Sequence, residues 1–381
     1  MTHRTRHLLA TAATATATIA AAALSVGAPA AAAHVTSWGV PHCHTVASDG
    51  SLTYTTNEGH TLRRTTGHMT PVRYQFSIAP LAAPGELLSA DQSGRLFHST
   101  DAGCSWTAGA TLTGMDIPQL EAAPDGTAYA WSVNTNLLSR VTDGGTVTAL
   151  PPLPTGGSSV VEVAVDPVDA THLRAVVDDG RVLESTNGGK TFGPIGSPPP
   201  GVYLYDASID LNDLDHIVLG TLGSSVYTTF DGGTTWAAAQ LGAAGDRANA
   251  FSVEISPASS RFVYVQGLDI TEFDQGAPSQ GRHIYRSRSG GRDFDAIVDQ
   301  GAGVTLVNGA LIVPHPTRPG TLYFVFGSNF GGYGTDLFRY RDRPGHAPDP
   351  LQVEHNPYDE IKSIAFNPQR PKVMYLGLAD E

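Results

Sequence analysis

The stretch from Ser99 to Trp106 reads Ser-Thr-Asp-Ala-Gly-Cys-Ser-Trp and places a carboxylate, hydroxyl groups and a thiol within eight residues. Such groups could activate a nucleophile or bind a metal ion. The same residue types also build tight turns, because Asp or Asn accepts hydrogen bonds from backbone amides and Gly tolerates a positive φ. Which role applies depends on how often the stretch recurs, and at what spacing.

The stretch recurs along the chain, each time after a short strand of alternating apolar and polar residues. The turn positions, separated by 42 to 58 residues, are Asn57, Asp101, Asp143, Asn187, Asp231, Ser289 and Asp342. An apolar strand that ends at or near a proline, such as Ile78-Ala79-Pro80, alternates with these turns. A period of about 40 to 50 residues with four short strands per repeat is typical of a β-propeller. We therefore predict an all-β fold, a seven-bladed β-propeller with four-stranded antiparallel blades.

The order of these landmarks also predicts how the ring closes. The first landmark is a turn, at Asn57, and the last is an inner strand within residues 361–376. We therefore expect strands from the N- and C-terminal parts of the chain to combine in one blade, which leaves no sheet edge open.

The repeated pattern Ser/Thr-x-Asp/Asn-x-Gly-x-Ser/Thr-aromatic resembles the Asp-box, or BNR, repeat of sialidases and related propellers. The match is best at residues 99–106, 185–192 and 229–236. The resemblance implies a structural role, in which these residues fasten strands and touch no ligand. The residues concerned are Asn57, Ser99, Asp101, Gly103, Trp106, Asn187, Gly189, Phe192, Asp231, Gly233 and Trp236.

The N-terminal segment has the features of an export signal. Arg4 and Arg6 precede an apolar run that ends in three alanines before His34. We predict a signal peptide at residues 1–33, a single propeller at residues 34–381 and a secreted, extracellular protein. An uncleaved membrane anchor is the alternative.

The charge balance argues against nucleic acid as a partner. The chain carries 23 Lys and Arg against 36 Asp and Glu, and two of the arginines leave with the predicted signal peptide. A strongly acidic surface repels phosphate backbones. It also disfavours a role like that of the assembly-factor propellers of photosynthetic membranes, for which a basic patch is expected.

Cys43 and Cys104 are the two cysteines of the chain. In an exported protein a disulfide between them is the favoured interpretation. Two buried free thiols, or a metal site that includes His42 and His44, are the alternatives.

Motifs that would indicate catalysis are missing. The Arg-Ile-Pro motif of sialidases does not occur, nor does a serine-hydrolase elbow, a zinc-protease helix or a phosphate-binding loop. Acidic pairs such as Asp178-Asp179 lie in turn-like contexts and give no sign of facing each other across a substrate, as a glycosidase requires. We predict no catalytic residues, no cofactor and no metal. A glycan-binding or glycan-cleaving propeller is the alternative.

Two repeats are longer than the others, and their extra residues are the best candidates for a partner-binding surface. They fall in Asp269–Arg282, which contains Phe273 and Asp274, and around Phe330 and Tyr333. Aromatic residues beside acids on exposed loops are typical of protein-binding surfaces. Ordinary mobile insertions are the alternative.

An exported, acidic Asp-box propeller of this length is similar to a family of secreted streptomycete proteins, the dispase autolysis-inducing proteins. The resemblance implies a non-catalytic protein that induces autolysis of thermolysin-like metalloproteases and donates glutamines to transglutaminase. We also predict that the protein is a monomer. Accessible glutamines are then the candidates for cross-linking, and we select Gln275, Gln280, Gln300 and Gln352.

Overall fold

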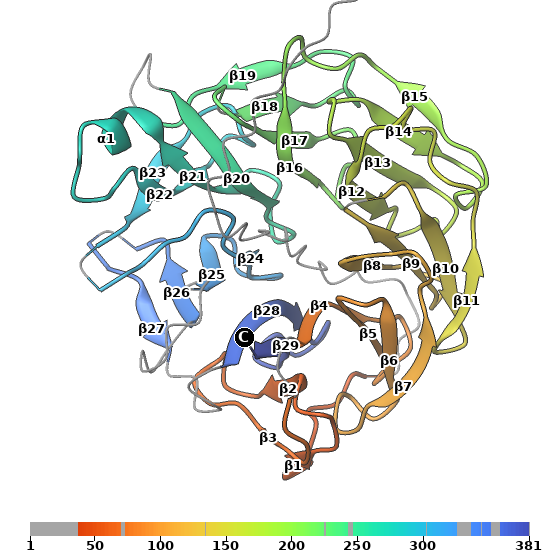
Figure 1. Ribbon diagram of the computed structural model, residues 1–381. Coiled ribbons are helices and arrows are strands. Elements are labelled where there is room, and N and C mark those ends of the chain that lie inside the picture. The colour runs from red at the N-terminus through yellow and green to blue at the C-terminus, as the bar shows by residue number, and fades with distance from the viewer. Residues whose placement is uncertain are drawn as a thin grey trace, which may run out of the picture.

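The computed structural model describes residues 37–69, 73–133, 135–224, 226–242, 247–301, 303–325, 337–343, 345–351 and 359–380. The predicted signal peptide, Phe330, Tyr333 and Gln352 lie outside the described residues. The sheets surround a common centre, and in each four-stranded sheet the first strand is the innermost (Figure 1). Among the described residues, none of the helices has the length and apolar character needed to span a membrane.

Five of the sheets each consist of four strands that follow one another in the chain. Their strands are β8 (Pro118–Ala122), β9 (Ala128–Ser132), β10 (Leu138–Thr142) and β11 (Thr146–Ala149); β12 (Val160–Val165), β13 (Leu173–Val177), β14 (Val182–Ser185) and β15 (Gly193–Ile195); β16 (Leu204–Ile209), β17 (Ile217–Thr221), β18 (Val226–Thr229) and β19 (Ala237–Ala239); β20 (Ala248–Ile255), β21 (Val263–Asp269), β22 (Arg282–Ser287) and β23 (Asp295–Asp299); and β24 (Ile312–Pro314), β25 (Thr321–Val325), β26 (Leu337–Arg341) and β27 (Asp349–Leu351). Each neighbouring pair is antiparallel, as in the blades of a propeller.

The prediction of seven separate four-stranded blades is wrong, because the structure has five. The strands expected to form two more lie in one seven-stranded sheet. These strands are β2 (Leu52–Thr55), β4 (Arg73–Pro80), β5 (Leu87–Asp91), β6 (Arg95–Ser99), β7 (Thr107–Thr111), β28 (Asp359–Phe366) and β29 (Met374–Asp380). Backbone pairing of the end of β29 with the start of β4, over two residue pairs, merges the β4–β7 part with the β2, β28 and β29 part.

Strands from the two ends of the described chain pair in this sheet, as predicted. β2 runs antiparallel to β29, with Leu52 opposite Gly377 and Thr55 opposite Met374. The segment before β2 adds two contacts to the C-terminal region, because the Trp38 amide donates to Gln369 at 3.0 Å and Asn367 donates to the Gly39 carbonyl at 3.1 Å. A short parallel pair, β1 (Thr45–Val46) and β3 (Arg64–Thr65), lies beside β2.

The core lies between neighbouring sheets. Leu120 of β8 packs toward the preceding sheet with Leu88 and Leu96, whereas Trp131 and Val163 belong to the cluster between the β8–β11 and β12–β15 sheets. Side chains in a strand alternate between its two faces, so each blade buries apolar residues against both of its neighbours. Loops at the ends of the strands are therefore left to contact other molecules.

Candidate functional site

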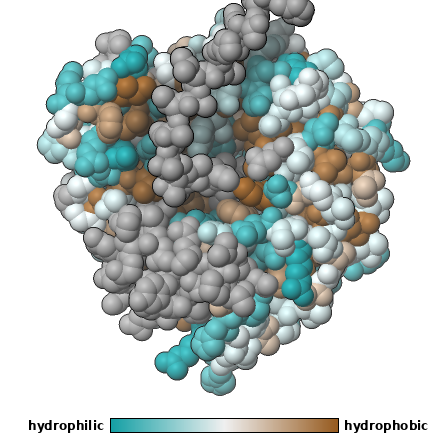
Figure 2. Space-filling view, in the orientation of Figure 1, coloured by the Kyte–Doolittle hydropathy of each residue, from teal (hydrophilic) through white to brown (hydrophobic). Residues whose placement is uncertain are grey.

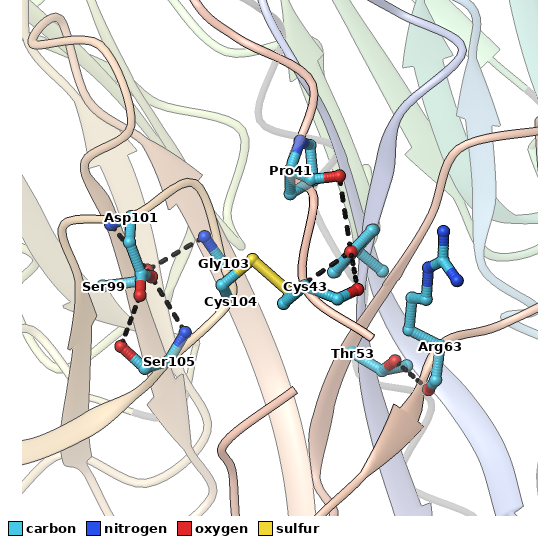
Figure 3. Close-up of a disulfide and its surroundings, with 10 residues drawn as sticks. Pro41, Cys43, Thr53, Arg63, Ser99, Asp101, Gly103, Cys104 and Ser105 are labelled. Atoms are coloured by element: carbon cyan, nitrogen blue, oxygen red, sulfur yellow. Dashed lines mark hydrogen bonds between the residues drawn. A yellow bond between two sulfur atoms is a disulfide. The ribbon is translucent and has the colours of Figure 1, made fainter. Parts of the chain in front are cut away.

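The turn after β6 is held together by its own side chains. Ser99 donates to a carboxylate oxygen of Asp101 at 2.9 Å and accepts the Gly103 amide at 2.9 Å (Figure 3). The same carboxylate accepts the Ser105 amide at 2.8 Å. Gly103 has a φ of +84°, and a Cβ there would lie 3.0 Å from the ring of Tyr375. This geometry favours the predicted structural role over a catalytic one.

Three other turns repeat this arrangement. A hydroxyl at the end of the preceding strand accepts the amide of the glycine two residues after the Asp or Asn, and the Asp or Asn accepts the backbone amide four residues after itself. The corresponding bonds are Gly59 to Thr55 at 3.3 Å and Thr61 to Asn57 at 3.1 Å, Gly189 to Ser185 at 3.0 Å and Thr191 to Asn187 at 3.0 Å, and Gly233 to Thr229 at 3.0 Å and Thr235 to Asp231 at 2.8 Å. Trp106, Phe192 and Trp236 are partly buried against the neighbouring core clusters.

Cys43 and Cys104 form the predicted disulfide, with their Cα atoms 5.7 Å apart (Figure 3). Backbone hydrogen bonds reinforce the connection, because the Ala47 amide donates to the Cys104 carbonyl at 2.8 Å and the Trp106 amide donates to Ala47 at 2.9 Å. The disulfide thus clamps the N-terminal segment onto the turn after β6. Within the described part of the chain, no group of three His, Cys, Asp or Glu residues could hold a metal ion.

The long segment after β21 contains a short helix, α1 (Ile270–Asp274), rather than an irregular insertion. Asp269 caps this helix by accepting the Glu272 amide at 3.0 Å. Glu272 in turn accepts hydrogen bonds from Ser279 at 2.7 Å and from the His283 ring at 3.0 Å, and both contacts lower the pKa of the Glu272 carboxyl, that from Ser279 most. The buried His283 ring also contacts Asp299 at 2.7 Å. These contacts tie α1 to its blade.

Two exposed aromatic side chains lie on neighbouring blades, in loops at the same end of the propeller. Phe273 in α1 is 50% exposed, and Tyr203, just before β16, is 64% exposed. Asp274 pairs with Arg247 at 2.9 Å, which holds α1 beside the chain that enters β20. We call Tyr203, Arg247, Phe273 and Asp274 the aromatic patch. In Figure 2 the surface over α1 is largely hydrophilic, with apolar residues exposed beside it.

We call the turns around Asn57, Asp101, Asn187 and Asp231 the fastening turns. The strand order puts the aromatic patch on the side opposite these turns. In an antiparallel four-stranded blade, the loop from the second to the third strand and the loop into the next blade share one end. α1 lies in a loop of the first kind and Tyr203 in one of the second, whereas Asp231 and its equivalents connect third and fourth strands. Sequence reasoning missed Tyr203 because its loop is not elongated. A tyrosine after the Pro- and Gly-rich stretch at 198–201 was the available signal.

The structure brings three of the four selected glutamines to the blade that carries α1. Gln275 follows α1 directly, is exposed, and its side-chain amide makes no hydrogen bond to a described residue. Gln280 is exposed but accepts from Arg282 at 2.7 Å, and Gln300 is half-buried and accepts the Leu306 amide at 3.3 Å. The backbone amide of Gln300 also donates to the Arg282 carbonyl at 3.0 Å, which places Gln300 next to the same loop.

Sequence reasoning also missed a group of buried acids on four consecutive innermost strands. They are Glu121 in β8, Glu162 in β12, Asp206 in β16 and Glu254 in β20, each at most 7% exposed. Burial raises the pKa of Glu121 to about 8 and that of Asp206 to about 7. Burial, with the neighbouring charges of Glu121, Asp206 and Glu254, raises the pKa of Glu162 as well. The signal was a single acid inside each of these apolar strands.

Together, the antiparallel blades and the self-contained turns define an all-β propeller with exposed aromatic side chains in loops at one end. The sequence is 41% identical to the dispase autolysis-inducing protein of Streptomyces mobaraensis over 354 residues, which cover 92% of each chain. The chain therefore belongs to the family of that protein.

Two other similarities are more distant. A xyloglucanase of Acetivibrio thermocellus is 23% identical over 262 residues, which span 56% of this chain and 29% of the enzyme. The solved structure of YCF48 from Cyanidioschyzon merolae superimposes with a TM-score of 0.57 at 12% identity, over 81% of this chain and 96% of that chain. A likeness at this identity shows the fold alone. No family model matches the sequence.

Proposed function

We propose that this protein acts outside the cell, binds a thermolysin-like metalloprotease and promotes the self-digestion of that protease, without hydrolysing it. The observation that carries the proposal is the 41% identity, over 92% of both chains, to a protein whose name states that it induces autolysis of dispase. The disulfide supports an extracellular place of action, because disulfides persist in oxidising compartments.

The aromatic patch is the surface that we propose for the protease. Aromatic side chains and arginines dominate the binding energy of protein interfaces, and Tyr203, Phe273 and Arg247 supply both types. The contacts of Glu272 with Ser279 and His283 hold α1 in place before binding, so little order has to be gained on association.

Induced self-digestion follows from binding one state of the protease in preference to another. A protease chain that opens locally exposes cleavable backbone to other copies of itself. A partner that binds this open state more tightly raises its population by the ratio of the two affinities. The propeller then needs no catalytic group of its own.

The test is to incubate purified thermolysin with this protein and to follow the intact protease and its peptidase activity with time. We expect loss of intact thermolysin to accelerate several-fold, and to stop when an active-site inhibitor of thermolysin is added. Fragments that still form with the inhibited protease would show that the propeller itself cleaves. No acceleration at any concentration would overturn the proposal.

Variants of the patch locate the surface. Phe273→Ala and Tyr203→Ala are expected to reduce the acceleration at least about tenfold, as is usual for interface hot spots. Val168→Ala is the matched control, because Val168 is 80% exposed but lies in the loop between β12 and β13, at the opposite end of the blades. If Val168→Ala reduced the acceleration as much as Phe273→Ala and Tyr203→Ala, the binding surface would lie elsewhere.

We further propose that Gln275 is the main glutamine donor for transglutaminase. In that reaction a primary amine replaces the nitrogen of the γ-carboxamide and ammonia is released, so the amide has to be accessible. The Gln275 amide is exposed and unpaired among the described residues, whereas those of Gln280 and Gln300 are hydrogen-bonded. With transglutaminase and a fluorescent amine, Gln275→Asn should lose most of the label. Gln280→Asn should retain it, and the reverse pattern would contradict the assignment.

A further inference from the structure

Arginines concentrate at one place of this acidic protein. A pocket of about 380 Å³ lies between the loop from β24 to β25 and the turn after β26. Its lining includes Arg318, Arg341 and Arg343, together with Gly320 and Asp342. Arg341 is partly exposed and Arg343 is exposed. The pocket is at the end of the propeller opposite the aromatic patch.

The acid in this pocket is already engaged by other arginines. One carboxylate oxygen of Asp342 lies 2.6 Å from Arg286, and the other lies 2.6 Å from Arg288. Asp342 occupies the turn position that Asp101 and Asp231 hold in other repeats, but here the carboxylate accepts from the arginines of the preceding blade. Because Asp342 pairs with Arg286 and Arg288, its carboxylate does not compensate the positive charges of Arg341 and Arg343.

A second acid nearby is equally occupied. Glu58 contacts Arg318 and Arg339, each at 2.8 Å. Burial raises the pKa of Glu58, but the two guanidinium groups lower it more, so this carboxyl stays ionised. Arg341 and Arg343 make no ion pair with any residue of the chain that the structure describes. Two guanidinium groups thus face a pocket without an acidic partner, in a chain with 13 more acids than bases.

We propose that this pocket binds a compact, multiply charged oxyanion, such as phosphate or sulfate, free or as the head of a larger molecule. Guanidinium groups are planar and donate paired hydrogen bonds that match the spacing of phosphate oxygens. Arg341 and Arg343 supply the charge and Arg318 a third donor, held in place by Glu58. A pocket of this volume is within the range of small-molecule sites and leaves room for a group attached to the anion.

The test measures binding of sodium phosphate and sodium sulfate to the whole protein by calorimetry and thermal unfolding, at an ionic strength kept constant with sodium chloride. We expect saturable binding, which Arg341→Gln and Arg343→Gln each weaken about tenfold or more. Arg341→Lys keeps the charge but loses the paired donors, and we expect an intermediate affinity. Arg95→Gln is the charge-matched control, because Arg95 is exposed on β6, in another sheet.

Three results would overturn the proposal. They are the absence of saturable binding, equal weakening in Arg95→Gln, and acetate binding as tightly as sulfate. Comparison of phosphate with glycerol phosphate identifies the source of the anion, because tighter binding of the ester indicates a larger ligand and equal binding indicates the free ion. Melting of the variants without ligand within about 2 °C of the parent shows that they fold.

Discussion

Glu121 is a carboxyl group enclosed by apolar strands, and this has a consequence for stability. Its pKa of about 8 in the folded protein lies above its ordinary value of 4.5, because burial penalises the charged form. Between these two pH values the folded protein keeps a proton that the unfolded chain has lost. The free energy of unfolding contributed by Glu121 therefore decreases as the pH rises from about 4.5 to about 8. Asp206, with a pKa of about 7, acts in the same direction.

Glu121→Gln tests this dependence. The substitution keeps the size and polarity of the side chain but cannot ionise. We expect the variant to be more stable than the parent at pH 8.5, by on the order of a few kcal/mol, and nearly equal to it at pH 5. Urea unfolding at both pH values measures the difference. The control is Glu86→Gln, in the loop between β4 and β5, which should leave the slope unchanged. An unaltered pH dependence in Glu121→Gln would show that this carboxyl is already ionised in the folded state.

At the scale of the element, the turns around Asp101, Asn187 and Asp231 each connect two neighbouring antiparallel strands. In the turn after β6 the carboxylate of Asp101 accepts bonds from Ser99 and Ser105, which also act on its pKa. Burial raises that pKa, but the bonds from Ser105 and Ser99 lower it more. The turn is therefore stabilised by the ionised form, and this contribution is lost as the pH falls through the lowered pKa.

Asp101→Ala should destabilise the protein by about 1–2 kcal/mol, because the carboxylate's bonds from the Ser99 hydroxyl, the Ser105 hydroxyl and the Ser105 backbone amide disappear. Asp101→Asn should cost much less, since Asn57 and Asn187 occupy the same position in turns of equal geometry. Urea unfolding at pH 7 compares the two variants with the parent. Equal losses for Ala and Asn would mean that the charge matters more than the local acceptor.

What the sequence could predict depends on the range of the interactions involved. The turns around Asp101 and Asp231 were predicted because their bonds join residues at most four apart. α1 was not, because its position depends on His283, which a later strand supplies. The number of separate sheets depended on the pairing of Ala379 with Tyr74, two residues from opposite ends of the chain. The buried acids on β8, β12, β16 and β20 become neighbours only when these consecutive blades pack against one another.

At the scale of the whole molecule, β29 joins more strands than any other element of the seven-stranded sheet. It pairs with β28, β2 and β4. Met374, Leu376 and Leu378 of this strand are at most 1% exposed and belong to one core cluster with Ile361 and Val325. By contrast, residues 37–69 form one edge of the sheet, held by the pairing of β2 with β29, the disulfide, the ion pairs of Glu58 and a few buried side chains such as Trp38.

Two truncations therefore should behave differently. Removal of residues 373–381 deletes β29, which exposes the cluster around Ile361 and leaves β2 and β28 without a partner. We expect this chain to lose cooperative unfolding and to aggregate.

Removal of residues 1–69 deletes β1 to β3 and the disulfide but keeps the pairs of β29 with β28 and β4. We expect this chain to fold with a much lower Tm. It loses the disulfide, which closes a loop of 61 residues and contributes about 4 kcal/mol at most, and it also loses the buried Trp38, Leu52 and Tyr54 side chains and the ion pairs of Glu58. Circular dichroism and thermal melting distinguish the two. A folded chain without β29 would mean that the ring closes through contacts other than this strand.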